Sequence, residues 1–269
     1  MKVYELEKEF EAVAPTYLKE DYDNVGLMIG DTEAEIENIL VALDCTKEVI
    51  SEAKEMNCQM IYSHHPLLFR KPSSITTKTL LGTKIIELIK NDIALYSAHT
   101  NLDSVEQGIN DSLVKLLGFE SGIVMDLNRK AMAKGYECGI GRLIELETPI
   151  TLKELLERIN TNFSDAPIRY SGTLEKEIKV IAVINGSGMD FFQRAKELGA
   201  DAIITGDTTY HFVSDYTEED IAIIDMEHFY SEWQGLKLVA KTIEEKLKDK
   251  KVNIIISEKS KSPYKIFKT

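Results

Sequence analysis

The chain has 269 residues, of which 43% are hydrophobic and 29% are charged, a composition that excludes a disordered chain and predicts a globular protein with a substantial core. Its 45 acidic and 32 basic residues give a formal net charge of -13, which repels a phosphate backbone and makes nucleic acid an unexpected partner. There is neither an apolar leader nor a run of about 18 apolar residues, so neither export nor membrane insertion is expected.

Cysteine usage indicates the compartment. The three cysteines, Cys45, Cys58 and Cys138, are odd in number and widely spaced. This pattern fits neither a disulfide framework nor a CxxC metal or redox motif. We therefore expect a reducing, cytoplasmic location.

Short runs rich in Ile and Val alternate with segments of helical period along the chain. Such alternation is typical of an α/β fold with mostly parallel sheets. The runs are almost continuously apolar, as expected for strands that helices cover on both faces. The clearest expected strands lie at residues 38–45, 59–63, 92–98, 179–185, 201–206 and 220–226.

An internal similarity indicates that the chain consists of two similar α/β halves, 1–125 and 126–269, although chance resemblance between two βαβ units is the alternative. No linker rich in Pro or Gly marks the boundary near residue 126, so we expect the halves to pack closely. The matching segments are residues 53–63 with 195–205, and residues 93–96 with 221–224.

The second half carries an inserted β-α segment over about residues 130–175 and, in its C-terminal part, the last candidate ligands described below. Residues 139–147 have a strand-like pattern. Thr151 and Glu154 form a capping box that predicts the start of an amphipathic helix over residues 152–163.

The segment Asn185–Gly188 follows the strand expected at residues 179–185 and precedes a helix expected from about Met189. We interpret it as a tight strand-to-helix connection. The alternative is a turn whose backbone N–H groups bind a phosphate, although the segment is an incomplete dinucleotide-binding motif.

All five histidines, His64, His65, His99, His211 and His228, lie shortly after an expected strand, which is not the placement of core histidines. The carboxyl ends of parallel strands meet at one edge of a sheet, where open α/β sheets bind ligands. His64 and His65 can act together only if their strand ends at Ser63, because successive side chains of a strand point to opposite faces. Pro66 favours such an end. A chance pair of histidines in a loop is the alternative.

Two further strand ends carry similar side chains. His99 and Asp103 combine an imidazole with a carboxylate, the usual ligands of a borderline divalent metal, but Asp103 could equally cap the next helix. His228 and Glu232 share one helix face if the chain is helical from Met226, where a simple surface pair is the alternative. Because three strand ends each offer such groups, we interpret them as one shared metal site.

These residues lie in motifs that occur in the same order in NIF3-like proteins, and the chain resembles that family over nearly its whole length. The family is also catalogued as the GTP cyclohydrolase 1 type 2 homologues. The resemblance implies two similar α/β halves, with mostly parallel sheets, packed around a shared dinuclear metal site, and a homohexameric ring. The motifs are Asp23–Leu27, Ser63–Leu67, Ala98–Asp103, Thr205–Asp207 and Asp225–Glu232.

The resemblance implies that the metal ligands are His64, His65, Asp103, His228 and Glu232. Five side chains are too many for one tetrahedral ion and suit two ions about 3.5 to 4 Å apart, with Asp103 and Glu232 as the natural bridges. Without thiolate ligands the site favours Zn, Mn, Fe, Co or Ni over soft metals, and its histidine content argues against Ca and Mg.

His99 and His211 belong to recurring motifs of the family but not to its ligand set. This position suits an acid-base role near the metals, whereas a buried structural role is the alternative. The internal alignment gives Asp207 the place that His65 holds in the first half, so we expect Asp207 near the same crevice.

Two functions follow from the resemblance. The first is a metal-dependent hydrolase with a nucleotide-like substrate, which the family label suggests is GTP. The second is a ring-shaped metal-binding scaffold or regulatory protein without catalytic turnover. Release of formate from GTP separates the two, while a ring that clasps DNA is disfavoured by the net charge of -13.

Overall fold

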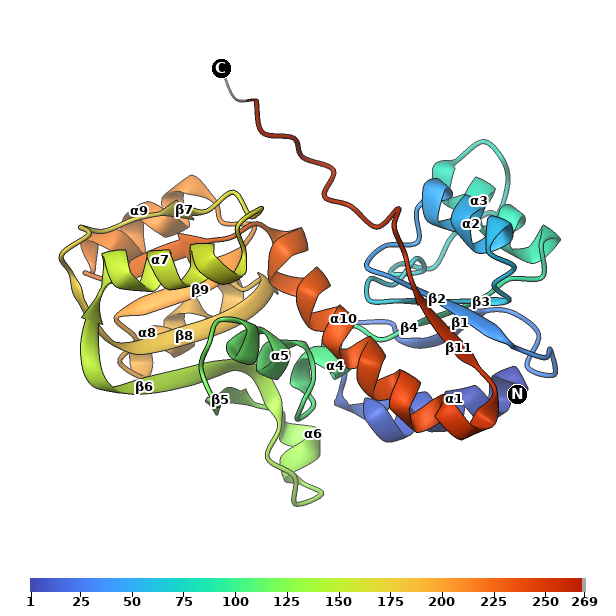
Figure 1. The fold of residues 1–269 in the computed structure, drawn as a ribbon, viewed down its shortest axis with the longest axis horizontal. Coiled ribbons are helices and arrows are strands. Elements are labelled where there is room, and N and C mark those ends of the chain that lie inside the picture. The colour runs from blue at the N-terminus through green and yellow to red at the C-terminus, as the bar shows by residue number, and fades with distance from the viewer. Residues whose placement is uncertain (268–269) are drawn as a thin grey trace. The chain divides into compact units, whose positions relative to one another are not determined.

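A computed structural model describes residues 1–267, whose ribbon is drawn in Figure 1. The chain forms two compact units: Met1–Val105 with Leu236–Lys261, and Glu106–Gly235 with the residues from Ser262 onward. Each unit contains one sheet and its covering helices, and this confirms the expected α/β fold with sheets of mostly parallel strands. The expected boundary between the two similar halves, near residue 126, stays a prediction.

The sheet of the first unit has four parallel strands and one antiparallel edge strand. Every residue of its β3 and β4 is buried, as their continuous hydrophobicity predicted. The spatial order is β1 (Gly26–Ile29), β4 (Ala94–Ser97), β3 (Met60–Ser63), β2 (Asn38–Ala42) and β11 (Asn253–Ile256).

Helices cover both faces of this sheet. Helices α2 (Lys47–Glu55) and α3 (Leu80–Lys90) pack on the face formed by residues such as Ile61 and Leu95. Helix α1 (Val3–Val13) lies on the opposite face (Figure 1), where Phe10 packs against alternate strand residues. The Phe10 ring centroid lies 5.0 Å from that of Tyr62 and 4.8 Å from that of Tyr96. The remaining helices here are η1 (Thr16–Leu18), α4 (Thr100–Ser104) and η3 (Lys248–Lys250), with the C-terminal part of α10 (His228–Leu247).

The sheet of the second unit has a parallel centre, β8, β9 and β10, and antiparallel strands on either side. The expected insertion contributes β6 to this sheet, directly beside β8. The spatial order is β5 (Ile123–Leu127), β6 (Gly139–Thr151), β8 (Glu177–Ser187), β9 (Ala202–Gly206), β10 (Ala222–Asp225) and β7 (Arg169–Tyr170).

Two hydrophobic clusters enclose the second sheet, because alternate residues of its strands point to opposite faces. Leu155 of α7 packs with Ile204 on one face, and Phe192 of α8 packs with Ile203 on the other. The helices of this unit are α5 (Ile109–Leu116), α6 (Arg129–Met132), α7 (Leu152–Asn162), η2 (Met189–Phe191), α8 (Phe192–Glu197), α9 (Tyr210–Glu218) and the start of α10.

Local signals in the sequence mark several boundaries correctly. The capping box is confirmed, since Thr151 Oγ1 accepts from Glu154 N and the Glu154 carboxylate accepts from Thr151 N. The tight connection around Asn185–Gly188 is also confirmed, because β8 ends at Ser187 and η2 begins at Met189. Within residues 1–267, no helix has the length and apolar character needed to cross a bilayer.

Candidate metal centre

In the first unit, two neighbouring strands end side by side and direct their following residues to one place. Strand β3 ends at Ser63, as the pair of histidines required, and Ser63 is in register with Ser97, the last residue of β4. Their hydroxyl oxygens lie 2.8 Å apart, and Ser63 Oγ donates to His65 O at 3.0 Å. The hydroxyl pair fixes the point at which the chain leaves the sheet.

The three histidines that follow these strands form a cluster. One ring nitrogen of each of His64, His65 and His99 lies within 4.8 Å of those of the other two. The ring centroids are 5.1 Å apart for His64 with His65, and 5.1 Å for His64 with His99. His64 is fully buried, and its Nε2 lies 3.6 Å from Asp103 Oδ1. The cluster therefore offers imidazole nitrogens beside a carboxylate.

Hydrogen bonds define which ring nitrogen of each histidine is available to a metal. A carbonyl or ionised carboxylate only accepts, so a neutral imidazole that bonds to one through Nδ1 carries its proton there and has its lone pair on Nε2. All three rings meet this condition. The partners are Ala98 O for His64 at 2.8 Å, Asp44 Oδ1 for His65 at 2.9 Å and Asp23 Oδ1 for His99 at 2.9 Å.

Asp23 is a buried carboxylate that orients His99. Its Oδ2 also accepts from Thr100 N at 3.1 Å and from Thr100 Oγ1 at 2.5 Å. Burial opposes ionisation, but the hydrogen bonds and charge of His99 and the bonds from Thr100 outweigh it and lower the pKa of Asp23 to about 2. Asp23 was noticed in the sequence only as part of a motif, and the structure gives it a physical role.

Asp103 lies within a short helix instead of capping the next one. Helix α4 spans Thr100–Ser104, and Asp103 is buried in it. The following helix, α5, begins at Ile109 with Gly108 at its N-cap. The capping alternative for Asp103 is therefore wrong, because the chain turns helical before Asp103 and leaves its carboxylate beside His64.

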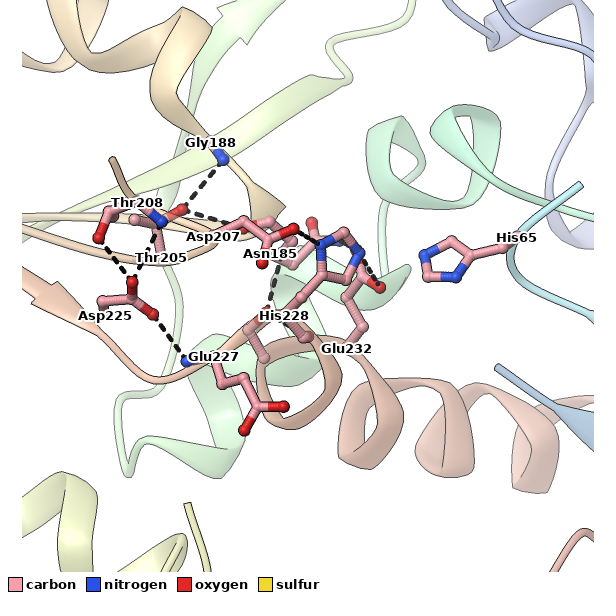
Figure 2. A network of polar contacts seen from close by, with 12 residues as sticks. His65, Asn185, Gly188, Thr205, Asp207, Thr208, Asp225, Glu227, His228 and Glu232 are labelled. Carbon is pink, nitrogen blue, oxygen red and sulfur yellow. Dashed lines mark hydrogen bonds and ion pairs between the residues drawn. The ribbon is translucent and has the colours of Figure 1, made fainter. Parts of the chain in front are cut away.

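The second unit holds a similar arrangement at the start of α10. His228 begins this helix, and its Nε2 lies 3.0 Å from Oε2 of Glu232, one turn later, so the two share a helix face as expected. The other ring nitrogen, Nδ1, lies 2.7 Å from Asp207 Oδ2. Glu232 is buried, and its Oε1 accepts from Asn185 Nδ2 at 3.2 Å. Figure 2 shows the His228 ring between Asp207 and Glu232.

Asp225, at the end of β10, connects the loops that carry Asp207 and His228. Its Oδ2 accepts from Thr208 N at 3.1 Å, from Thr208 Oγ1 at 2.6 Å and from Arg169 Nη2. Its Oδ1 accepts from Glu227 N at 2.8 Å, so both oxygens are used (Figure 2). These bonds fix the loop after β9 to the loop after β10. Asp225 could have been found in the sequence, because a carboxylate that ends a buried apolar strand requires hydrogen-bond partners.

Two glycines allow the start of α10 to approach the ends of the strands. Gly186 has φ +60°, and a Cβ there would lie 2.1 Å from Glu232 Oε1. A Cβ on Gly206 would lie 2.7 Å from His228 N. A larger residue at either position would displace the His228 and Glu232 pair.

His211 lies elsewhere on the second unit. It is an exposed residue of α9, and its ring centroid is 5.4 Å from that of Tyr210. Among the described contacts of residues 1–267, none joins His211 to Asp207 or His228. Its acid-base role stays a prediction.

The donor chemistry of both units suits a metal. The first unit offers several imidazoles beside the buried Asp103, and the second offers His228 beside the buried Glu232. Imidazole nitrogens with carboxylates are the donor set of a borderline divalent cation. The cysteine thiols add nothing to either group, so a soft ion is not favoured. Each unit therefore carries residues that could bind a metal ion.

Comparison with known proteins identifies the family of the chain. The model of the family DUF34/NIF3 (NGG1p interacting factor 3) matches residues 1–263. The "GTP cyclohydrolase 1 type 2 homolog" of Clostridium perfringens is 55% identical over 264 residues, covering 98% of this chain and 99% of that protein. The protein of the same name in Clostridium acetobutylicum is 52% identical over 267 residues, covering 98% of each chain.

A solved structure gives the same result for the fold. The crystal structure of the Bacillus cereus protein related to NIF3 superposes with a TM-score of 0.88, at 25% identity, and the match covers 99% of both chains. Sequence and fold thus agree over almost the whole length. The chain belongs to the DUF34/NIF3 family.

Proposed function

We propose that His64, His65, Asp103, His228 and Glu232 bind two divalent metal ions and that the protein is a metal-dependent hydrolase with a nucleotide-like substrate. One observation carries the metal proposal. In each unit, the Nδ1 of every candidate histidine is held by a carbonyl or a carboxylate. Outer partners of this kind fix the ring and its tautomer in metal sites, and their loss typically weakens metal binding roughly 10- to 100-fold.

Within this proposal the carboxylates of Asp103 and Glu232 and the imidazoles of His64, His65 and His228 would hold the ions. The donor set favours Zn, Mn, Fe, Co or Ni. When bound, two such ions lower the pKa of a shared water and supply hydroxide near neutral pH. The homohexamer and the cytoplasmic location that the family resemblance and cysteine usage suggested stay predictions.

His99 is proposed as the acid-base residue. Its Nδ1 donates to Asp23, and its ring lies in the same cluster as His64 and His65. The free Nε2 can accept a proton while Nδ1 keeps its bond to the carboxylate. Since the pKa of Asp23 is about 2, this carboxylate is ionised at neutral pH and orients the ring by accepting from Nδ1.

The metal proposal is tested by elemental analysis of the purified protein. We expect two ions per chain in the wild type and fewer than one in Asp103→Ala. Asp249→Ala removes an exposed aspartate and should keep both ions. Full occupancy of Asp103→Ala would overturn the proposed ligand set.

The hydrolase proposal is tested with GTP, the substrate suggested by the name of the two clostridial relatives. Metal-loaded wild type should release formate, and His99→Gln should retain its metal but lose turnover by about 10²- to 10⁴-fold. Absence of formate at full metal occupancy would refute a GTP cyclohydrolase activity and leave the metal site standing.

A further inference from the structure

We infer that the second unit has a pocket for a planar heteroaromatic ring that carries an anionic group, as in a purine nucleotide. The pocket is a hollow of about 500 Å³ lined by β7, the loop after β9, α9 and β10. Its lining runs along α9 and includes Thr208 and Asp225 at the carboxyl ends of β9 and β10, where α/β sheets bind ligands. Its volume is within the range of small-molecule sites, roughly 300 to 1,000 Å³. The identification of this ligand as the substrate rests on the proposed function, whereas its binding does not.

Two tyrosines supply the aromatic surface of this pocket. Tyr170 on the two-residue edge strand β7 is 48% exposed, and Tyr210 at the start of α9 is 80% exposed. Both line the hollow, together with Val213 and Ile223. Aromatic side chains so exposed bind the faces of heterocyclic rings, and one such stack changes affinity by roughly tenfold or more. The lining therefore selects a planar ring over an aliphatic ligand.

Arg169 supplies the positive charge. Its Nη2 donates to Asp225, while the side chain, which lines the pocket, remains 71% exposed. A guanidinium has five N–H donors, so those that Asp225 does not use can bind a phosphate. Because the carboxylate already holds the guanidinium, less conformational freedom is lost when an anion binds. The lining also holds the carboxylates of Asp225 and Glu218, so an anionic ligand would bind through the guanidinium N–H groups that Asp225 does not use.

The pocket continues toward the residues that hold His228. A second hollow of about 530 Å³ shares Arg169, Thr208 and Asp225 with the first and is also lined by Asp207. Asp207 in turn holds the ring of His228. A ring seated between β7 and α9 thus leaves its anionic substituent at Arg169, on the side of the metal-binding residues of this unit.

The test is direct binding, measured by isothermal titration calorimetry with guanosine monophosphate, guanosine and ribose 5-phosphate. We expect guanosine monophosphate to bind most tightly. Tyr210→Ala should weaken it at least about tenfold, and Tyr210→Phe should restore it, since stacking needs only the ring. Arg169→Gln should weaken the nucleotide but leave guanosine unchanged. Tyr136→Ala and Arg129→Gln replace exposed residues outside the pocket and should bind as the wild type does.

Equal affinity of Tyr210→Ala and wild type for guanosine monophosphate would overturn the pocket. If Tyr210→Ala kept its affinity but changed the sedimentation coefficient, the exposed tyrosines would belong to a contact between copies of the chain and not to a ligand pocket. Nucleotide binding without formate release from GTP would support the pocket and refute the hydrolase. Formate release with an unchanged KM in Tyr210→Ala would support the hydrolase and refute the identification of the bound ligand as its substrate.

Discussion

Replacement of Asp225 by Asn keeps the size of the side chain but removes its charge and one of its two acceptor atoms. The carboxylate accepts from Thr208 N, Thr208 Oγ1 and Arg169 through Oδ2, and from Glu227 N through Oδ1. An asparagine oxygen at the Oδ2 position would keep the larger set of bonds. Its NH₂ group would then face the N–H of Glu227, where two donors meet and no bond can form.

The free-energy cost follows from this count. A buried N–H that loses its acceptor costs about 1–3 kcal/mol, and the bonds that remain lose the added strength of a charged acceptor. The ion pair with Arg169 adds little, because that side chain is 71% exposed. We therefore expect Asp225→Asn to lower the free energy of unfolding by about 2–4 kcal/mol.

Urea unfolding in the presence of a chelator measures this cost without a contribution from bound metal. Thr208→Val, which removes one of the two bonds from this residue, should cost about 1 kcal/mol. Asp190→Asn, at an exposed aspartate, should change the free energy of unfolding by less than about 0.5 kcal/mol. Hydrogen exchange in Asp225→Asn should increase first at residues 205–209 and 226–229, since Asp225 fixes these two loops to each other.

Metal affinity gives an independent measure of the same bonds. When the loops loosen, Asp207 no longer holds His228 in one orientation, and we expect metal binding about 10- to 100-fold weaker. A stability of Asp225→Asn within about 0.5 kcal/mol of wild type, with unchanged metal affinity, would refute the role given to this carboxylate.

Three further predictions test other contacts. Gly186→Ala should lose metal affinity, because its Cβ would lie 2.1 Å from Glu232 Oε1. Gly199 has a similar positive φ but no atom within 4 Å of an added Cβ, so Gly199→Ala should keep its metal affinity. Equal metal affinity of the two variants would contradict this prediction. The folded-state pKa of Asp23 is about 2, below its ordinary 3.8, so its contribution of about 2 kcal/mol is present above pH 4 and lost as the pH falls toward 2. Urea unfolding with a chelator should show this pH dependence in wild type but not in Asp23→Asn, and parallel pH profiles would exclude it. Burial raises the pKa of the Cys45 thiol to about 12, so a thiol reagent at pH 8 should modify it only in denaturant, and rapid modification of the native thiol would contradict its burial.

The elements that position the site could be predicted because their signals are local. Continuous apolar runs gave the strands, and Pro66 after the histidine pair favoured the end of β3 at Ser63, where the structure has it. Thr151 and Glu154 similarly marked the start of α7. In each case, the residues that decide the structure are a few positions apart in the chain.

The residues that hold the histidines could not be predicted in the same way. Asp44 bonds to His65 across 21 positions, and Asp23 bonds to His99 across 76. Such pairs depend on which strands become neighbours, and an isolated aspartate in a loop has no pattern that reveals its partner. The capping alternative for Asp103 is wrong for the same reason. The short helix α4 depends on tertiary contacts, such as the bond from Thr100 to Asp23, and no local pattern reveals these contacts.

The internal similarity between the two strands extends to the helices that follow them. Residues 93–96 align with 221–224, and continuing this alignment places Thr100, the first residue of α4, opposite His228, the first residue of α10. Each helix follows the matching strand and carries a buried carboxylate about one turn after its start, Asp103 in α4 and Glu232 in α10. The same alignment pairs Asp103 with Ser231, so the helix starts match while the two carboxylates differ by one position. Matching strands and helix starts are what duplication of one strand-loop-helix unit would give, and this duplication stays a prediction.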